Sequence, residues 1–329
     1  MACRYLDSFD TYTTLAERWT TPNGCEINAA AARTCIAGMR YSGSAQSVCT
    51  TTLNAQGTWI IGFAFRITTM AGYTLARTLD AANLQGTLAL NATGTLTVSG
   101  GAVTATSILT LLANVWYYIE FKHIIANAAG TLEVRVNGAV WATVAGDTQT
   151  TGNATADQIS LNTPAGASTG AHYDDLYIFD GTGAINNDYA GEVQIEYLAC
   201  NADGNSEQWT PSAGSNFQNV DEAAPDDDTT YNSTSTEGNK DTFGMANISI
   251  AAATIPAIQV IIRARKESAG TANIQRVYRS GVSENNGASF NPSTSYATQL
   301  EIMETDPIAL GAWTVTNLNA AEMGYAAVA

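Results

Sequence analysis

The chain has 329 residues, of which 45% are hydrophobic and 13% charged, and its formal net charge is −16. The charged share is about half the usual one, and Ala, Thr, Asn, Ser and Gly replace it, as is typical of densely turned β-structure. The acidic balance excludes a nucleic-acid-binding surface, because such a surface needs clustered Lys and Arg. The nearest approach to a basic cluster, at Arg263, Arg265 and Lys266, alternates along a predicted strand and indicates a solvated face.

Membrane insertion and secretion are not expected from the sequence. No stretch reaches the roughly 18 apolar residues that a membrane span needs. The N-terminus, MACRYLDSFDTY, lacks the charged start and the apolar run of a secretory signal. We therefore expect synthesis in the cytoplasm, without a membrane anchor.

The five cysteines, at positions 3, 25, 35, 49 and 200, are odd in number and show no C-x-x-C spacing. A zinc site is therefore not expected. A bridge between Cys25 and Cys35 is conceivable, but without a secretory signal the sequence favours free, mostly buried thiols.

Residues 131–144 predict a β-hairpin. Apolar and polar side chains alternate over residues 131–136, which is the pattern of a half-buried strand. Asn137-Gly138 then supplies the two positive-φ positions of a type I′ turn, and residues 140–144 return.

Further short strands are predicted on both sides of this hairpin, each rich in alternating, β-branched or aromatic residues. They cover residues 58–68, 116–125, 158–162 and 172–179, and residues 86–98 form a second hairpin around 91–94. Many short strands separated by polar turns indicate a sandwich and not a βαβ fold.

In this order, the strands resemble a concanavalin A-like (laminin-G-like) jelly roll over roughly residues 5–185. The resemblance is carried by DSFDTY, TWIIGFAFRI, WYYIEFKHI, LEVRVNGAVWATV, QISL and HYDDLYIFD. It implies an all-β fold, with a concanavalin A-like jelly-roll sandwich in residues 1–190 and a second, smaller β-sandwich domain in residues 191–329.

The second half begins with a predicted strand over residues 191–199. An acidic excursion, residues 201–241, then holds nine acidic residues against one lysine, a net −8 that is half of the whole chain's charge. It also contains aromatic residues, so we expect it to be ordered. Strands are predicted again over 258–266, 273–279 and 298–303, followed by a short helix over 319–323, capped by Asn317 and stopped by Gly324, and by a last strand.

Two motifs of this half, VDEAAPDDDTTY at residues 220–231 and AWTVTNLNAAEMGY at 312–325, resemble the C-terminal portion of tailed-phage virion proteins. The resemblance implies a non-enzymatic structural component of the virion exterior, as a head decoration, fibre or tail protein, synthesised in the host cytoplasm. Its expected partners are other capsid or tail proteins and further copies of itself, with docking or oligomerisation assigned to the second domain. Weak adhesion to a host surface glycan stays open.

Catalytic motifs are incomplete in the sequence. A retaining glucanase needs Glu-x-Asp-x-x-Glu, and the nearest match, Glu304 and Asp306, continues with Ala309. Gly166 to Gly170 has the form of a nucleophile elbow around Ser168, but no helical pattern follows it and no histidine occurs beyond His172. We therefore expect no enzyme; the alternative is a carbohydrate-binding module or a polysaccharide-active enzyme on the same fold.

Four carboxylates are candidate Ca²⁺ ligands. The resemblance implies that Asp174, with Asp180 near the strand end, contributes oxygens to a Ca²⁺ site of the kind that laminin-G-like domains carry. Asp174 and Asp175 are adjacent in a predicted strand, so we expect their side chains on opposite faces. Asp226 and Asp228 lie in an Asp-rich loop that suits a hard cation. The alternative is that these are rim and surface acids that bond loop amides; no other cofactor is expected.

Aromatic side chains are the candidates for a glycan or subunit contact. Trp209, Tyr173 and Trp141 are the predicted binding residues, with Trp209 the most exposed because it lies in the polar excursion. The two histidines, His123 and His172, lie in predicted strands and are expected to be structural.

Overall fold

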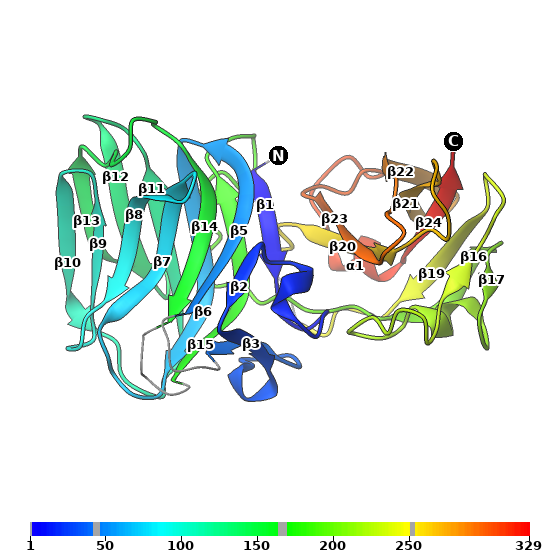
Figure 1. Cartoon of the computed structure of the whole chain (residues 1–329), viewed down its shortest axis with the longest axis horizontal. Helices are drawn as coiled ribbons and strands as arrows, with labels where there is room; N and C mark the ends of the chain where they lie inside the picture. The colour runs from blue at the N-terminus through cyan, green and yellow to red at the C-terminus, as the bar shows by residue number, and fades with distance from the viewer. Residues whose placement is uncertain (1, 42–46, 164–169, 251–253) are drawn as a thin grey trace. The chain divides into compact units, whose positions relative to one another are not determined.

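The structure is a computed structural model that describes residues 2–41, 47–163, 170–250 and 254–329 (Figure 1). The chain divides into two compact units, Met1–Ile195 and Glu196–Ala329. Antiparallel strands dominate both units, so the predicted all-β fold class is confirmed. Among the described residues, no helix has the length and apolar character needed to cross a membrane.

The first unit contains an eight-stranded sheet, sheet A, in the order β13-β12-β11-β6-β15-β4-β3, with β1 paired to β15. Two 3₁₀ turns, η1 (Leu15–Glu17) and η2 (Ala29–Ala31), lie in its connections. The strands of sheet A are β1 (Cys3–Asp7), β3 (Cys25–Asn28), β4 (Gly38–Tyr41), β6 (Thr58–Ile67), β11 (Tyr117–Ile124), β12 (Gly130–Val136), β13 (Ala139–Gly146) and β15 (Ala171–Asp180).

The second sheet of this unit, sheet B, has seven strands in the order β10-β9-β8-β7-β14-β5-β2 (Figure 1). Its strands are β2 (Thr21–Asn23), β5 (Ser47–Gln56), β7 (Tyr73–Asp80), β8 (Asn83–Leu90), β9 (Thr95–Gly100), β10 (Val103–Thr110) and β14 (Ala156–Thr163).

Side chains of sheet A reach across to the backbone of sheet B, so the two sheets enclose one core. The Trp59 indole Nε1 donates to the Ala156 carbonyl oxygen at 3.0 Å, and the Tyr173 hydroxyl donates to that of Asn162 at 2.6 Å. Trp59 and Tyr173 are fully buried. This is a face-to-face sandwich with inward side chains from both sheets.

The strongest local prediction, the hairpin at residues 131–144, is confirmed. Asn137 and Gly138 have φ values of 50° and 79°, as a type I′ turn requires, and Val136 pairs with Ala139. The predicted strands over 58–68, 116–125, 158–162 and 172–179 correspond to β6, β11, β14 and β15, and the predicted 86–98 hairpin to β8 and β9.

His123 lies in the core, as the prediction of a structural imidazole requires. Its Nδ1 lies 2.8 Å from the Thr78 hydroxyl and its Nε2 lies 3.2 Å from the Thr148 carbonyl oxygen. A neutral imidazole with the proton on Nε2 satisfies both partners. The ring lies against Gly86, where an added Cβ would be 2.7 Å from Nδ1.

Burial lowers the pKa of His123 to about 4, which gives a pH prediction. A group whose folded-state pKa lies below its unfolded value of about 6.5 stabilises the fold fully above pH 6.5, and this contribution falls as the pH drops towards 4. We expect a loss of about 2 kcal/mol of unfolding free energy between pH 7.5 and 5 from this group, because the unfolded chain takes up the proton first.

Nitrogen NMR of the imidazoles checks this directly, with His172→Gln used to assign the two rings. The His123 ring is expected to remain neutral at pH 5. In urea denaturation, the unfolding free energy of His123→Gln is expected to fall less steeply towards acid pH than that of the wild type. Titration of His123 near pH 6.5 would contradict its burial in the core.

The second unit is built on a five-stranded sheet in the order β16-β19-β24-β21-β22, with two further strand pairs, β17-β18 and β20-β23. Its elements are β16 (Cys200–Glu207), β17 (Thr210–Pro211), η3 (Asn216–Asn219), β18 (Asn232–Ser233), β19 (Lys240–Met245), β20 (Ile258–Ala264), β21 (Asn273–Ser280), β22 (Ser283–Phe290), β23 (Ala297–Met303), α1 (Val315–Asn319) and β24 (Ala321–Val328).

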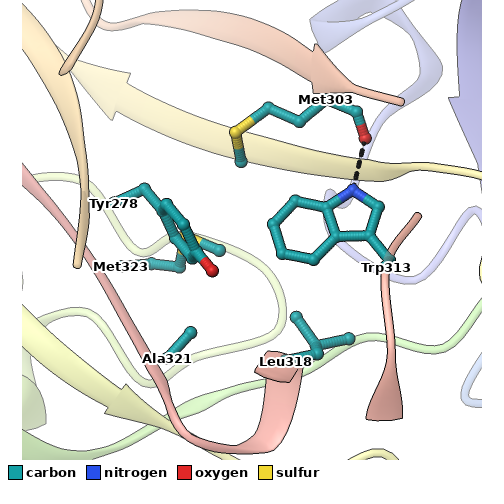
Figure 2. Close-up of a cluster of buried hydrophobic side chains, with 6 residues drawn as sticks. All are labelled: Tyr278, Met303, Trp313, Leu318, Ala321 and Met323. Atoms are coloured by element: carbon teal, nitrogen blue, oxygen red, sulfur yellow. Dashed lines mark hydrogen bonds between the residues drawn. The ribbon is translucent and has the colours of Figure 1, made fainter. Parts of the chain in front are cut away.

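The core of this unit contains the residues of the terminal motif (Figure 2). The Trp313 ring packs edge-on against Tyr278, with ring centroids 5.4 Å apart, and its Nε1 donates to the Met303 carbonyl oxygen at 2.9 Å. Leu318 and Met323 complete the cluster, against which Ile258 and Val260 of β20 pack. The motif at residues 312–325 therefore supplies the packing centre of the second unit.

Two sequence predictions for this unit are wrong. The helix lies earlier than residues 319–323, because the Thr314 hydroxyl caps it by accepting from the Asn317 amide at 3.1 Å. Residues 321–328 continue as β24, and Gly324 lies against β19 so closely that a Cβ would be 1.9 Å from the Asp241 carbonyl oxygen. Gly324 therefore permits strand pairing here and does not stop a helix.

The acidic segment 201–241 is ordered, as predicted, but it is not an excursion from the sheet. β16 and the start of β19 belong to the five-stranded sheet, and β17, η3 and β18 connect them. β16 is polar because it is an edge strand, where one side of the strand and much of its surface face water.

Candidate functional site

Two adjacent carboxylates lie buried within β15. Asp174 and Asp175 are each 1% exposed. Asp175 has a φ of 50°, in the left-handed region, and the pairing of β15 with β6 shifts register between Asp174 and Tyr177. This β-bulge breaks the alternation of side chains. The prediction that the two carboxylates point to opposite faces is therefore wrong, because one residue, Arg33, contacts both.

Arg33 and the backbone hold the pair in place. The Arg33 backbone N donates to Asp174 Oδ2 at 2.6 Å, and its Nη1 donates to Asp175 Oδ2 at 3.0 Å. The backbone N of Asp175 donates to Asp174 Oδ1 at 2.8 Å. A third buried carboxylate, Asp10, accepts bonds of 2.9 and 2.8 Å from the amides of residues 36–37, while its Oδ2 has no partner.

Burial raises the pKa of all three carboxyl groups, because it disfavours their charged forms. The pKa of Asp174 rises to about 8, with the nearby charge of Asp175 as the second cause. The pKa of Asp175 rises to about 6, against the lowering effects of the Ile195 amide and Arg33. Within the pair, burial therefore disfavours the charge of Asp174 more strongly, whereas Arg33 stabilises the charge of Asp175.

This cluster also holds residues 192–195 in place through hydrogen bonds and an ion pair. Asp175 Oδ1 accepts a bond from the Ile195 amide at 2.8 Å, and Arg33 Nη1 donates to the Val193 carbonyl oxygen at 3.1 Å. Arg33 also pairs with Glu192. The predicted strand over residues 191–199 is wrong, since side chains take the backbone groups that a sheet would use.

The residues of this cluster bind segments of the chain to one another. Both oxygens of Asp174 and both of Asp175 accept bonds from the chain's own amides or guanidinium. A general acid or nucleophile needs an oxygen within reach of a substrate. Only Asp10 Oδ2 in this cluster lacks a donor, and Asp10 is 4% exposed.

The other predicted Ca²⁺ ligands have protein partners too. Asp180 pairs with Arg4, and its Oδ1 accepts a bond from the Thr182 amide at 2.7 Å. Asp226 accepts bonds from the amide and hydroxyl of Thr230 at 3.1 and 2.9 Å. Among the residues that the structure describes, no group of three His, Cys, Asp or Glu side chains could hold a metal ion.

The acidic loop lies on the basic strand β20. Asp227 binds Arg263 through both oxygens, at 2.5 and 2.8 Å, and Asp228 binds Arg265 at 2.9 Å. The Tyr296 hydroxyl donates to the same Asp228 oxygen at 3.0 Å. The prediction of a plain solvated basic face at residues 263–266 is corrected by these ion pairs, which bind one charged segment to another.

None of the three predicted aromatic binding residues lies on an open surface. Tyr173 is fully buried in the core of the first unit. Trp209 is half-buried: its Nε1 donates to the Asn239 carbonyl oxygen at 3.0 Å, and its ring packs edge-on against Tyr325. Trp141 is half-buried on β13, 6.4 Å from the Tyr117 ring. The expectation of an exposed Trp209 is wrong because the acidic segment folds around it.

Sequence reasoning missed Asp10 and Arg33. Asp10 is part of DSFDTY, one of the segments that carry the jelly-roll resemblance, and its neighbour Asp7 accepts bonds from the Tyr12 hydroxyl and the Trp19 Nε1 at 2.7 and 3.0 Å. Asp7 and Asp10, two acids on either side of an aromatic residue, are the sequence feature from which this site could be predicted. Ser168 lies outside the described residues.

Among the cysteine side chains that the structure describes, Cys25, Cys35 and Cys200 are free thiols. The Cys25–Cys35 bridge is therefore absent. Cys3 is buried and the other three are half-buried, while the side chain of Cys49 lies outside the described part.

No protein-family model matches the chain, and no curated protein does. Solved structures similar to it include an endo-β-1,4-glucuronan lyase from the fungus Trichoderma reesei, at 12% identity and a TM-score of 0.41, covering 51% of this chain and 93% of the lyase. Alginate lyase Aly36B is similar at 11% identity and a TM-score of 0.39, covering 59% of this chain and 98% of the lyase.

A Trypanosoma rangeli sialidase is similar at 12% identity and a TM-score of 0.35, over 47% of this chain and 27% of the sialidase. At these identities and TM-scores, the likeness carries no information about activity.

Proposed function

We propose that this chain is a non-enzymatic structural protein of the exterior of a tailed-phage particle. The observation that carries the proposal is the use of its buried carboxylates. Asp174, Asp175, Asp180 and Asp241 each accept bonds from loop amides of the same chain. Satisfied buried polar networks make loops rigid. Rigid loops on a sandwich suit a displayed building block better than they suit a mobile catalytic site.

The terminal motif supports the same proposal. Residues 312–325 resemble tailed-phage virion proteins, and their side chains build the core of the second unit. A motif that forms a core specifies a fold, so proteins that share this motif are expected to share the architecture of that unit.

Mass spectrometry of density-purified phage particles tests the proposal. Peptides from both units are expected in a fixed ratio to the capsid protein, before and after a high-salt wash. Recovery only from the soluble fraction of the lysate would contradict the proposal, and so would depolymerisation of a bacterial surface polysaccharide by the purified chain.

One observation favours a second candidate, the binding of an acidic polysaccharide. The Thr78 hydroxyl points into the core at His123, so alternation places Arg77 on the outer face of sheet B. Arg77 Nε is buried and has no hydrogen-bond partner. The register places Ser160 and Thr87 beside it, and their hydroxyls are bonded to Asn162 and Ser99. A guanidinium with an unpaired nitrogen suits the carboxylate of a uronic acid.

The second candidate predicts that Arg77→Gln weakens binding to alginate about tenfold, since one charge-assisted hydrogen-bonding group is lost. Affinity electrophoresis of the full chain measures this. Arg40→Gln is the matched control, because that guanidinium is already paired with Glu26. Binding of a neutral glucan as strong as that of alginate would contradict the candidate.

A further inference from the structure

One edge of the first unit exposes a group of large apolar side chains. β10 is the edge strand of sheet B, and β13 is the edge strand of sheet A. Most of the exposed large hydrophobic residues described in this unit lie on or next to these two strands. We call this surface the apolar edge; its members are Ile108, Leu109, Leu112, Val115 and Val140.

The two edge strands lie side by side, which brings the segments that carry these residues together. The Ala102 amide donates to the Asp147 carbonyl oxygen at 2.9 Å, which joins the start of β10 to the end of β13. At the other end, the Leu112 amide donates to the Tyr117 hydroxyl at 3.0 Å, and the Tyr117 ring packs against Trp141 of β13. Tyr117 thus joins the segment that carries Leu112 to Trp141.

A bulge in β10 turns the most exposed residue outward. The register with β9 shifts between Thr106 and Thr110. Within the shift, the Ser107 hydroxyl accepts from the Leu96 amide at 2.9 Å and donates to the Leu109 carbonyl oxygen at 2.7 Å. Ile108 is 94% exposed as a result. An isoleucine held in water by a hydrogen-bonded bulge has no function in the core of this unit.

The edge also lacks the charges that usually protect exposed strands. Residues 81–119 contain no Asp, Glu, Lys, Arg or His, and neither do the residues of β13, in a chain with a net charge of −16. Sheet edges in monomeric proteins are normally protected by charged side chains, above all Lys, or by Pro. The apolar edge is therefore a neutral surface on an otherwise acidic molecule.

We propose that the apolar edge binds the same edge of a second copy of this chain in a symmetric dimer. Two copies with a net charge of −16 each repel one another, and the repulsion is least where both surfaces are neutral. A two-fold contact places the same patch on both sides, and an apolar patch is complementary to itself. A charged partner surface would gain no ion pair here, whereas the same neutral edge of a second copy meets this one without a like-charge contact.

The dimer is tested with the full chain by sedimentation velocity. We expect dimers at about 100 μM, where a dimer with a micromolar Kd is nearly complete. Added salt is expected to strengthen the association, because it screens the repulsion between acidic copies. Ile108→Asp is expected to weaken the dimer at least about tenfold, because the change places two like charges at the contact.

Val282→Asp is the matched control, because Val282 is 97% exposed in the second unit and lies outside the apolar edge. Circular dichroism is expected to show the same fold for both variants, since each side chain is in water in the monomer. A monomeric wild type at this concentration overturns the proposal, and so does a dimer that Ile108→Asp and Leu112→Asp leave intact. Neither result affects the particle experiment, which measures association with capsid or tail proteins.

Discussion

Replacing Trp313 by alanine is expected to destabilise the second unit strongly while the first unit keeps its stability. Trp313 is 3% exposed, packs against Tyr278 and donates to the Met303 carbonyl oxygen. Removal of a buried tryptophan typically costs about 3–5 kcal/mol of unfolding free energy. That loss is a large fraction of the roughly 5–15 kcal/mol of stability typical of a domain. Urea denaturation followed by circular dichroism would then show an early transition with the amplitude of the second unit.

Tyr231→Ala is the control for this experiment. Tyr231 belongs to the same unit and is also aromatic, but it is 41% exposed, so its removal is expected to cost less than about 1 kcal/mol. A Trp313→Ala chain with the wild-type midpoint would show that the cluster in Figure 2 is not the packing centre of the unit.

The substitution Gly62→Val is expected to destabilise the first unit by roughly 3–5 kcal/mol. A Cβ on Gly62 would lie 2.1 Å from Cε1 of Tyr177. The Tyr177 ring would have to leave its place, and its hydroxyl would no longer donate to the buried Glu120. Glu120 would keep the Gly191 amide as a donor at 2.8 Å, and the lost hydrogen bond from Tyr177 adds its own penalty to the steric one. The midpoint of thermal unfolding of the first unit measures the sum.

A second substitution separates the steric cause from a general intolerance of β6. In a Tyr177→Ala background, the ring that meets the new Cβ is absent, so Gly62→Ala is expected to add little further loss. Gly152→Ala is the neutral control, since nothing lies within 4 Å of a Cβ there. Additive losses in the double variant would contradict the role given to the Tyr177 ring.

Local patterns were sufficient to predict most strands of the first unit. The alternation over residues 131–136 and the Asn137-Gly138 turn act within a few residues, so the sequence alone specified that hairpin. The helix at residues 315–319 was misplaced because Thr314 competes with Asn317 as the cap, and because pairing with β19 and β21 draws residues 321–328 into a strand. Tertiary pairing overrode local propensity there.

The candidate site was predictable only in part. Asp174 was identified from its strand, but its partners Asp10 and Arg33 lie more than a hundred residues away in the sequence. The bulge at Asp175 cancels the alternation on which strand reasoning depends. Trp209 was expected to be exposed because its neighbours are polar, yet Asp241 and Asn216 fold those neighbours around it.

The position of β15 in sheet A has a consequence for how the chain folds. β15 lies between β6 and β4 and also pairs with β1, yet it follows all the other strands of that sheet in the sequence. During synthesis, the edges of β4 and β6 that pair with β15 therefore stay unpaired until residues 171–180 leave the ribosome. Pairing across such long separations is slow. Insertion of this one strand would limit the folding rate, and the half-made sheet would be the species most prone to aggregate.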